Sequence, residues 1–466
     1  MDISEFYRGR NVLVTGVTGF VGKAIVEKLL RCCPDVGCIY VLVRSKRGID
    51  PMDRITKVLR MSVFADLPVE KVTPVVGDVT LPNLGLSIED YDAVVSNVSV
   101  VLHSAATVSF VEPLRLAVLL NVQAIQHILQ LSRSIKNLAS VVHVSTAYSN
   151  CDRRDIGEEI YAAPVGVKEM LRRAQEEGDL LDNEASRLIG KRPNTYTFTK
   201  ALAENLWAED ARDLPVAIVR PSIIGWAWRD PIPGWVDNAN SIVGPFTAIA
   251  SGTMRSVHCD PAKVCDLIPV DIVVNTVLAA ACRTARERPP LPGIQEEPGR
   301  AAQRASATPT VYNCVSGASN PVTWGKLLHE YLVAVRANPS PRALWWPDCT
   351  FTPSWLYHNI RVATLMILPA FLFDLIAPLL GRSTSLLKTQ RRSKNLITTL
   401  SPFCTNDWNF SDGNMRRLWS DLSARDRILF PLDVTAIDWV AYMRTAAVGY
   451  KRFLMKEEVN TGPRNV

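Results

Sequence analysis

A tyrosine and a lysine stand four residues apart in the pattern Tyr196-x-x-x-Lys200. On a helix, this spacing puts both side chains on one face. An ammonium group beside a phenol favours the phenolate, so we expect Lys200 to lower the pKa of Tyr196 and make its hydroxyl a usable general acid. The same ammonium could hold the ribose of a nicotinamide cofactor. The pair therefore predicts proton transfer to a carbonyl oxygen.

Two hydroxyl groups, those of Ser145 and Thr146, follow an apolar stretch from Val141 to Val144 that is typical of a buried strand. We expect Thr146 to donate a hydrogen bond to the substrate carbonyl oxygen beside Tyr196, with Ser145 as the second candidate. The alternative is that Thr146 only satisfies backbone groups at the end of the strand. A Tyr-x-x-x-Lys pattern is common by chance, so its meaning depends on the surrounding elements.

The first of these elements is a short strand, a glycine turn and a helix that runs through Ala24 to Leu30. The glycines are spaced G-x-x-G-x-x-G: Gly16 allows the turn, Gly19 lets the backbone approach a pyrophosphate, and Gly22 lets the helix pack closely on the sheet. The helix N-terminus favours an anion. The predicted cofactor contacts here are Thr15, Gly16, Thr18, Gly19, Phe20, Val21 and Gly22.

Basic residues follow the second predicted strand, Ile39 to Val43. An acidic residue at this position, roughly 20 residues past the glycines, would hold the ribose of NAD, whereas a basic residue accommodates the extra phosphate of NADP. Arg44, Lys46 and Arg54 therefore predict NADPH, with a solvated basic loop as the alternative.

Later strand ends supply further expected cofactor contacts. Asp78, next to Val79, could accept from an adenine amino group or be an ordinary turn aspartate. The small residues Ser104, Ala105 and Ala106 would let a dinucleotide lie flat across a strand end. Pro221, where a ring could lie, and Ile223 complete the set.

Strand and helix patterns alternate over the first 150 residues. This alternation predicts an α/β fold with a Rossmann-type, doubly wound parallel sheet and a ligand at the carboxyl ends of its strands.

Composition agrees with a large globular protein, because 47% of the 466 residues are hydrophobic. The net charge of +6 suits an anionic cofactor or a negatively charged membrane face and is too diffuse to indicate nucleic acid. The 10 cysteines form no C-x-x-C pair, so we expect reduced thiols and no metal site. The polar start at Met1 predicts no secretory signal peptide.

Taken together, the motifs resemble those of the alcohol-forming fatty acyl-CoA reductases, a family of the extended short-chain dehydrogenase/reductases. The matching stretches are 15–22, 41–44, 77–80, 143–150, 196–200, 220–223, 311–314, 320–325, 438–442 and 449–454. The resemblance implies NADPH and a long-chain fatty acyl-CoA substrate. It also implies a substrate-binding part and a mainly α-helical C-terminal domain.

The expected reaction is two hydride transfers, the first to the thioester and the second to the aldehyde left when CoA departs. The product would be a fatty alcohol, a precursor of waxes, ether lipids or surface lipids. The alternatives are an aldehyde-forming reductase, another extended dehydrogenase or epimerase, and a non-catalytic, membrane-tethered NADP-binding scaffold.

We expect a reductase domain over 1–282, an exposed flexible loop over 283–310, the end of the reductase domain over 311–345 and a helical domain over 346–466. Within that domain, the apolar run 362–380 is just long enough to span a bilayer, although Asp374 argues against a clean span. Cations follow the run, so we expect attachment to a membrane surface or bilayer, with a buried helical hairpin as the alternative. The expected location is an intracellular membrane, endoplasmic reticulum or peroxisome, with the catalytic domain facing the cytosol.

Overall fold

The computed structural model describes residues 1–287, 308–376 and 385–458. The chain forms two compact units, each assembled from three separate segments. Unit 1 comprises Met1–Ser222, Asp271–Val315 and Phe410–Asp433, and unit 2 comprises Ile223–Val270, Ser316–Asn409 and Val434–Val466. The compact units do not coincide with the predicted boundaries at 282, 310 and 345. These boundaries assumed consecutive domains, whereas the chain passes repeatedly between the two units.

Unit 1 is built on a seven-stranded parallel sheet with the order β11-β7-β5-β4-β1-β2-β3. The sheet confirms the predicted doubly wound α/β fold. The chain moves outward from β1 to β3 and then returns to the other side of β1 at β4. The reversal lies between β1 and β4, the place where such sheets bind ligands. The strands are β1 (Asn11–Thr15), β2 (Ile39–Val43), β3 (Val72–Val76), β4 (Val98–His103), β5 (Ser140–Val144), β7 (Val216–Pro221) and β11 (Thr310–Cys314).

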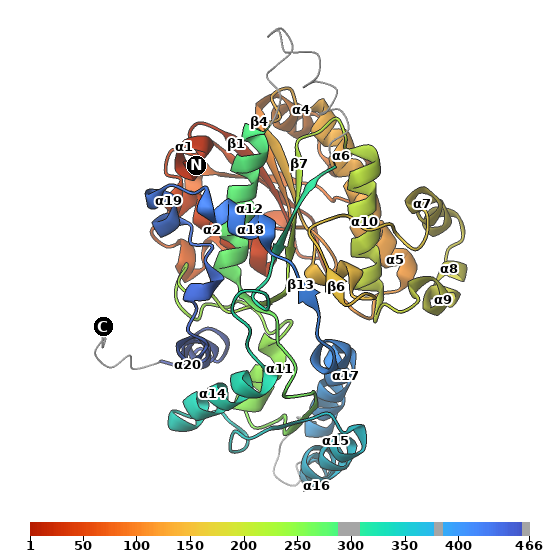
Figure 1. Cartoon of the computed structure of the whole chain (residues 1–466), viewed down its shortest axis with the longest axis vertical. Coiled ribbons are helices and arrows are strands. Elements are labelled where there is room, and N and C mark those ends of the chain that lie inside the picture. Colours follow the sequence, from red (N-terminus) through yellow and green to blue (C-terminus); the bar gives the residue numbers. More distant parts are fainter. Residues whose placement is uncertain (288–307, 377–384, 459–466) are drawn as a thin grey trace. The chain divides into compact units, whose positions relative to one another are not determined.

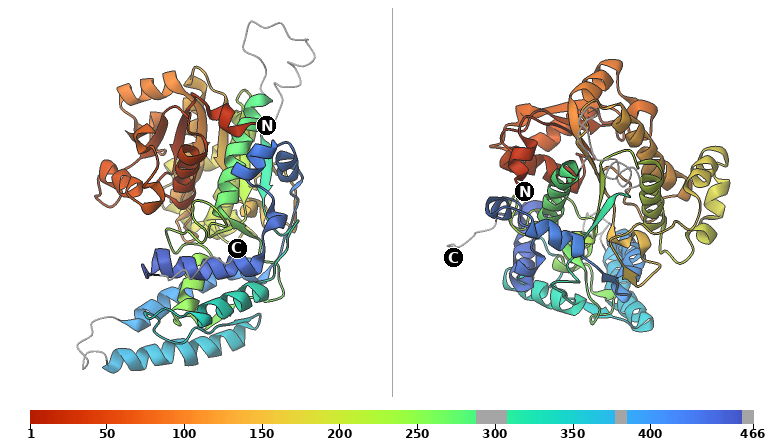
Figure 2. Two further views of the ribbon diagram at one scale, coloured as in Figure 1. Left: turned by 90° about the vertical axis from the view of Figure 1, so that its left-hand side faces the viewer. Right: turned by 45° about the horizontal axis from the view of Figure 1, so that its top comes forward.

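Helices cover both faces of this sheet, with α2 and α12 on one side and α6 and α10 on the other (Figures 1 and 2). Their apolar residues join the strands in a buried core, as Ile125 of α6 and Phe198 of α10 do beside Val101 of β4. The helices of unit 1 include α1 (Ile3–Tyr7), α2 (Phe20–Cys32), α3 (Pro51–Leu59), α4 (Ile88–Asn97), α5 (Leu114–Val118), η4 (Leu119–Gln123), α6 (Ala124–Ser134), η5 (Ala147–Asn150), α7 (Val167–Glu176), α8 (Leu180–Asn183), α9 (Ala185–Ile189), α10 (Thr195–Asp210), α12 (Val270–Arg286), α18 (Gly413–Ser420) and α19 (Ala424–Leu429).

The loop predicted from residue 283 begins later than expected. Arg283 lies within α12, where its Nε donates to Glu287 Oε1 at 2.5 Å, and its guanidinium also pairs with Asp421. The side-chain ion pairs stabilise the last helical turn. The rest of the predicted loop, 288–307, lies outside the described residues.

Unit 2 is mainly helical, with two short parallel strand pairs, β8–β10 and β9–β12. Trp226 packs against Phe246 and Tyr331, with ring centroids 6.0 and 6.3 Å away. Trp226 is fully buried and therefore belongs to the core of the unit. The elements include β8 (Ile223–Gly225), α11 (Val243–Ala250), β9 (Ser256–His258), β10 (Leu267–Pro269), α14 (Trp324–Ala337), β12 (Thr350–Thr352), α15 (Trp355–Val362), η6 (Ala363–Ile367), α16 (Leu368–Ile376), α17 (Leu386–Thr405), α20 (Trp439–Gly449) and η9 (Tyr450–Leu454).

Two helical stretches among the described residues are long and apolar enough to cross a membrane. Leu114–Ser134 is 61% buried and belongs to the core of unit 1, whereas Trp355–Ile376 in unit 2 is only 17% buried. The second stretch overlaps the predicted membrane segment, of which 377–380 lie outside the described residues.

Candidate active site

The glycine turn joins β1 to α2 at the reversal point of the sheet. Gly16 has a φ of +78°, and a Cβ there would lie 2.7 Å from the Ala105 nitrogen. A Cβ on Gly22 would lie 2.3 Å from the Gly16 carbonyl oxygen, so Gly22 brings the first turn of α2 against the loop itself and not against a strand. Gly19 caps α2 without a side chain. The backbone thus forms a cradle that only glycines permit, as expected where a pyrophosphate binds.

The ends of β1 and β4 are tied together by side chains. Thr15 Oγ1 lies 2.8 Å from His103 Nδ1 and accepts from the Ala105 nitrogen at 3.3 Å. Ser104 Oγ donates to the Thr15 carbonyl oxygen at 2.8 Å. Burial and the charge of Lys200 lower the pKa of His103 to about 3, so its imidazole is neutral. The hydroxyls of Thr15 and Ser104 therefore hold the crevice in shape.

A basic cluster lies beside the glycine turn. Arg54 Nη2 donates to Thr18 Oγ1 at 2.9 Å, and Arg54 also donates to the Arg44 carbonyl oxygen. Arg44 pairs with Asp78 at 3.0 Å. Burial opposes ionisation of Asp78, but hydrogen bonds from Thr80 and the Arg44 guanidinium lower its pKa. Burial together with nearby Arg44 and Arg54 lowers the pKa of Lys46. The three predicted cations therefore concentrate positive charge at the end of β2.

The other predicted cofactor residues fall at strand ends or in the first turn of α2. Phe20 and Val21 begin α2, and Val79 lies in the turn after β3, where its carbonyl oxygen is 2.9 Å from His127 Nδ1. Ala106 follows β4, and Pro221 ends β7. Ile223 is the exception, because it opens β8 and belongs to unit 2.

The structure brings Tyr196, Thr146 and Lys200 together. Tyr196 lies in the first turn of α10, whose cap residue Asn194 accepts from the Thr197 nitrogen at 2.9 Å. Thr146 lies two residues past the end of β5 and lowers the pKa of Tyr196, which places the two side chains near one another. Thr146 Oγ1 itself accepts from the Tyr148 nitrogen at 3.3 Å and donates to the Pro221 carbonyl oxygen at 3.5 Å. Lys200 Nζ donates to the Val144 carbonyl oxygen at 2.8 Å. The first turn of α10 and the end of β5 thus place a phenol, a hydroxyl and an ammonium in one site.

The predicted lowering of the Tyr196 pKa is wrong. Burial raises the pKa of Tyr196 to about 12, the Thr146 side chain opposes the rise, and the charge of Glu204 adds to it. Burial lowers the pKa of Lys200 to about 8, against the opposing effect of Glu204. Desolvation is thus the largest cause of both pKa shifts, and both groups favour their neutral forms more than in water.

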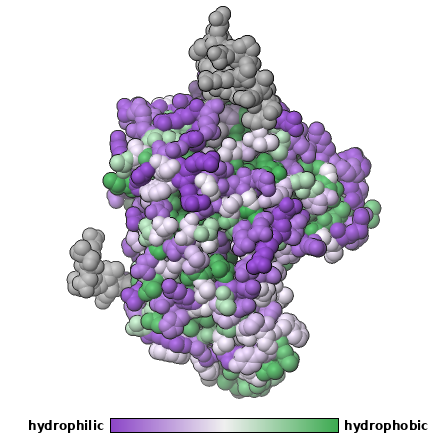
Figure 3. Space-filling model, viewed as in Figure 1, coloured by the Kyte–Doolittle hydropathy of each residue, from purple (hydrophilic) through white to green (hydrophobic). Residues whose placement is uncertain are grey.

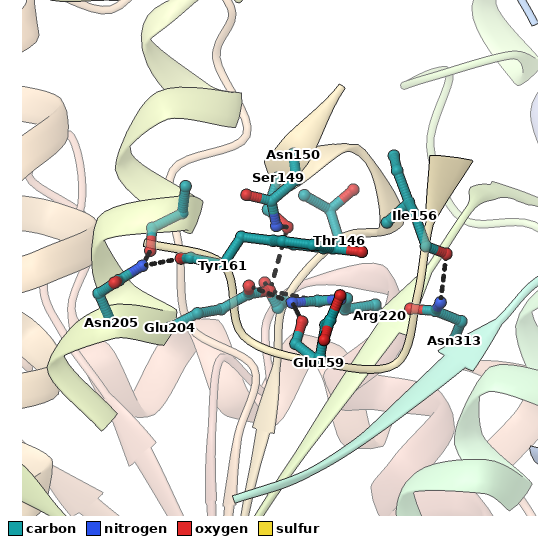
Figure 4. A network of polar contacts seen from close by, with 12 residues as sticks. Thr146, Ser149, Asn150, Ile156, Glu159, Tyr161, Glu204, Asn205, Arg220 and Asn313 are labelled. Atoms are coloured by element: carbon teal, nitrogen blue, oxygen red, sulfur yellow. Dashed lines mark hydrogen bonds and ion pairs between the residues drawn. The ribbon is translucent and has the colours of Figure 1, made fainter. Parts of the chain in front are cut away.

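A buried polar network lies behind the end of β5 (Figure 4). Arg220 of β7 pairs with Glu204 of α10 at 2.7 Å and donates to the carbonyl oxygens of Gly157 and Glu159. Ser145 Oγ donates to Glu204 Oε1 at 2.5 Å. The hydroxyl of the second predicted donor, Ser145, is therefore engaged by Glu204. The Thr146 hydroxyl bonds to the backbone of Tyr148 and Pro221, the contacts expected from its alternative role at the end of the strand, and lies near enough to Tyr196 to lower its pKa.

Sequence reasoning did not identify three residues beside this site. Arg220 could have been found from the sequence, because it is the one charge in the apolar strand Val216–Pro221, whereas Glu204 lies in a helix with other charged residues and gives no such signal. Phe110, in the loop after β4, places its ring centroid 5.6 Å from that of Tyr196. An aromatic residue in a loop gives no comparable signal. Among the described residues, no group of three or more His, Cys, Asp or Glu could hold a metal ion.

A doubly wound sheet, a glycine cradle and a Tyr-Thr-Lys site define a nicotinamide-dependent oxidoreductase of the short-chain dehydrogenase/reductase class. Residues 14–277 match an NAD-binding family described as male sterility protein, and residues 365–457 match a second family of the same description.

The sequence is 38% identical to fatty acyl-CoA reductase 1 of Xenopus laevis and 37% identical to that of Homo sapiens, each over 99% of this chain and 88% of the relative. It is 35% identical to fatty acyl-CoA reductase 2 of Bos taurus over 98% of this chain and 87% of the relative. The chain therefore belongs to the fatty acyl-CoA reductase family.

Two solved structures support the fold. The terminal R domain from the myxalamid PKS-NRPS biosynthetic pathway matches with a TM-score of 0.62 and 20% identity, over 96% of this chain and 91% of that chain. The reductase domain of a non-ribosomal peptide synthetase from Mycobacterium tuberculosis matches with a TM-score of 0.58 and 18% identity, over 97% and 95% of the two chains.

Proposed function

We propose that this protein reduces long-chain fatty acyl-CoA to fatty alcohol and free CoA, with NADPH as the reductant. The observation that carries the proposal is the placement of Tyr196 and Lys200 one turn apart on α10, with Lys200 Nζ bound to the Val144 carbonyl oxygen at the carboxyl end of β5, two residues before Thr146. NADPH would supply hydride to the thioester carbonyl and then to the aldehyde.

The residues around the sheet edge fit this cofactor. The cradle of Gly16, Gly19 and Gly22 would hold the pyrophosphate, because a side chain on Gly16 or Gly22 would fill it. Arg44, Lys46 and Arg54 would bind the 2′-phosphate that distinguishes NADPH from NADH. Lys200, when protonated, would hold the ribose hydroxyls near Tyr196.

The side chains of the candidate active site would act on the carbonyl oxygen of the substrate. Thr146 and Tyr196 would donate hydrogen bonds to the thioester oxygen, stabilising the charge that develops there. Tyr196 would then transfer its proton to that oxygen, which gives a hemithioacetal. Return of the hydroxyl proton to the Tyr196 phenolate would re-form the carbonyl as the C–S bond breaks and CoA leaves as a thiolate. The same two donors would serve the aldehyde in the second reduction. Thr146 is favoured over Ser145 because the Ser145 hydroxyl already donates to Glu204.

We also propose attachment to an intracellular membrane, supported by the exposed apolar helices in unit 2 and by a substrate that is poorly soluble in water. The catalytic unit would then face the cytosol, where acyl-CoA and NADPH are available. Endoplasmic reticulum and peroxisome are the two predicted locations.

The test is NADPH oxidation by purified, detergent-solubilised protein with a panel of acyl-CoAs, with products identified by gas chromatography. We expect fatty alcohol with two NADPH consumed per thioester. Tyr196→Phe should abolish turnover and keep NADPH binding, whereas Tyr91→Phe on the surface of unit 1 should behave like the parent. Aldehyde at one NADPH per thioester would overturn the alcohol product, and no turnover with NADPH bound would overturn the activity.

A further inference from the structure

The continuous helix formed by α15, η6 and α16 has one buried side and one exposed side. His358, Val362, Met366 and Ala370 recur every four residues and are at most 5% exposed. This stripe packs within unit 2, against β9 and α17. On the remaining surface, large apolar side chains are 51–66% exposed, namely Trp355, Leu356, Leu368, Phe371, Leu372 and Leu375. Figure 3 shows hydrophobic residues gathered where α15 and α16 lie in Figure 1.

The carboxylate in this helix has a structural role. Asp374 accepts hydrogen bonds from Ser385 Oγ at 2.7 Å and from the backbone nitrogens of Leu386 and Leu387 at 2.8 and 3.0 Å. It therefore caps the N-terminus of α17, where a negative charge is favourable. The capping ties the end of α16 to the start of α17, so the two helices form one packed hairpin.

The helix that packs against the apolar one is strongly basic. Between Leu386 and Thr405 there are four cations and no acidic residue, and Lys388, Arg391 and Lys394 are exposed. If α15–α16 crossed a bilayer, α17 would have to enter the hydrocarbon with it, which is costly for charged side chains. If the apolar helix instead lay along the membrane surface, the cations would stay at the level of the headgroups.

An aromatic and cationic rim adjoins the start of the helix. Trp345 and Trp346 are 59% and 56% exposed, on a segment anchored by the Leu344 nitrogen, which donates to the Ser251 carbonyl oxygen at 3.0 Å. The Arg255 guanidinium lies 5.8 Å from the Trp345 ring centroid, and Arg361 donates to the Arg255 carbonyl oxygen at 3.2 Å. Tryptophan and arginine together are typical of a surface that meets lipid headgroups.

We propose that the face formed by α15, η6, α16 and the Trp345–Trp346 segment docks in the plane of a lipid bilayer with anionic headgroups, without crossing it. Here this surface is called the docking face. The proposal rests on the membrane attachment put forward above and deepens it by naming the mode of attachment, the lipid chemistry and the residues. Apolar side chains would enter the headgroup boundary, while the cations of α17 and the rim would bind anionic lipid.

The first experiment is flotation of the full chain with phosphatidylcholine vesicles that contain or lack phosphatidylserine. The triple variant Leu368→Ser, Phe371→Ser and Leu375→Ser tests the docking face. Its matched control replaces three similarly exposed apolar residues of unit 1, as Ile88→Ser, Leu180→Ser and Ile428→Ser. We expect the parent and the control to float with phosphatidylserine vesicles, and the triple variant to bind at least tenfold more weakly with an unchanged melting temperature.

Equal flotation of the parent and the triple variant would overturn the proposal. Sedimentation of the lipid-free proteins tests a second copy of the chain as the occupant. A parent dimer that dissociates in the triple variant, without binding of the parent to vesicles, would assign the face to a subunit interface and also overturn the proposal.

A second experiment separates lying on the membrane from crossing it. Leu356→Cys and Leu375→Cys are each labelled with an NBD fluorophore, with the labelled parent as background for its own thiols. These positions are roughly 28 Å apart along the helix. Dithionite added outside the vesicles should quench both labels if the helix lies in the plane. Protection of either label would show that the helix crosses the bilayer and would overturn the proposed mode.

These measurements need neither NADPH nor turnover. They therefore test membrane docking separately from the proposed reaction. A parent that floats but does not reduce acyl-CoA overturns only the reaction. In detergent, with the acyl-CoA dispersed, the triple variant should reduce its substrate at the parent rate, because none of the three residues belongs to the candidate active site.

Discussion

Glu204 and Arg220 form a bidentate ion pair in the interior of unit 1, with Nε–Oε1 and Nη2–Oε2 distances of 2.9 and 2.7 Å. Both side chains are essentially excluded from solvent, at 1% and 0% exposed. Glu204 lies one helical turn beyond Lys200 on α10, and its Oε1 also accepts from Ser145 at the end of β5. The pair therefore fixes α10 against β5 and β7, the elements that carry Tyr196, Thr146 and Pro221.

Removing the charge of Glu204 should destabilise unit 1. Glu204→Gln leaves the Arg220 guanidinium buried without a counter-charge, so we expect the free energy of unfolding to fall by about 3–5 kcal/mol. Urea denaturation followed by circular dichroism measures this change. Glu209→Gln, on the exposed side of the same helix, is the control and should change stability by less than about 0.5 kcal/mol. Equal stability of the two variants would refute a role for the pair in holding the site.

Thr146 and Ser145 should respond differently to removal of their hydroxyls. Thr146→Ala takes away a donor to the substrate oxygen, so kcat should fall by roughly 10²–10³-fold. Ser145→Ala leaves Glu204 with one donor fewer, so its main effect should be a loss of about 1–3 kcal/mol of stability. Steady-state kinetics and thermal melting of both variants distinguish the roles. A larger loss of kcat in Ser145→Ala would reverse their assignment.

Lys200 should make a contribution to stability that grows with pH above about 8, which the parent and a Lys200 variant reveal by difference. Burial lowers its pKa from the ordinary 10.5 to about 8, so between these values the unfolded chain binds the proton and the folded chain does not. The contribution of Lys200 to the free energy of unfolding then increases by about 1.4 kcal/mol per pH unit in this window and is constant below it, so the slope of the parent should exceed that of Lys200→Met by this amount. Urea denaturation from pH 7 to 10 measures the slope. Lys200→Met should lack this contribution, and identical slopes would contradict a buried lysine with a lowered pKa.

Arg44 and Arg54 should select NADPH over NADH. Each of Arg44→Ala and Arg54→Ala removes a charged donor from the proposed phosphate site, so the affinity for NADPH should fall by about 10- to 100-fold, or about 1.5–3 kcal/mol. The affinity for NADH should hardly change. Titration of cofactor fluorescence measures both. Arg60→Ala, an exposed cation at the end of α3, is the control, and an equal loss for both cofactors would place the two arginines elsewhere in the dinucleotide site.

Local patterns in the sequence were sufficient to predict strands, a helix and the glycine turn of unit 1. The strand Ile39–Val43 was predicted with its observed bounds, and the helix predicted through Ala24 to Leu30 lies within α2. Both follow from runs of apolar residues, which report which side of a segment is buried. The glycine turn was predictable for the same reason, since a positive φ and contacts too close for a Cβ leave only glycine at Gly16.

Only the tertiary structure decided how the chain is divided, what the pKa values are and which face is left exposed. The two units interleave because distant segments complete each core, which no local pattern reports. Tyr196 and Lys200 are one turn apart, as the spacing requires, but their pKa values follow from burial, which depends on everything packed around them. In the same way, the apolar run after 355 is an exposed face and not a buried hairpin because α17 and β9 cover just one side of it.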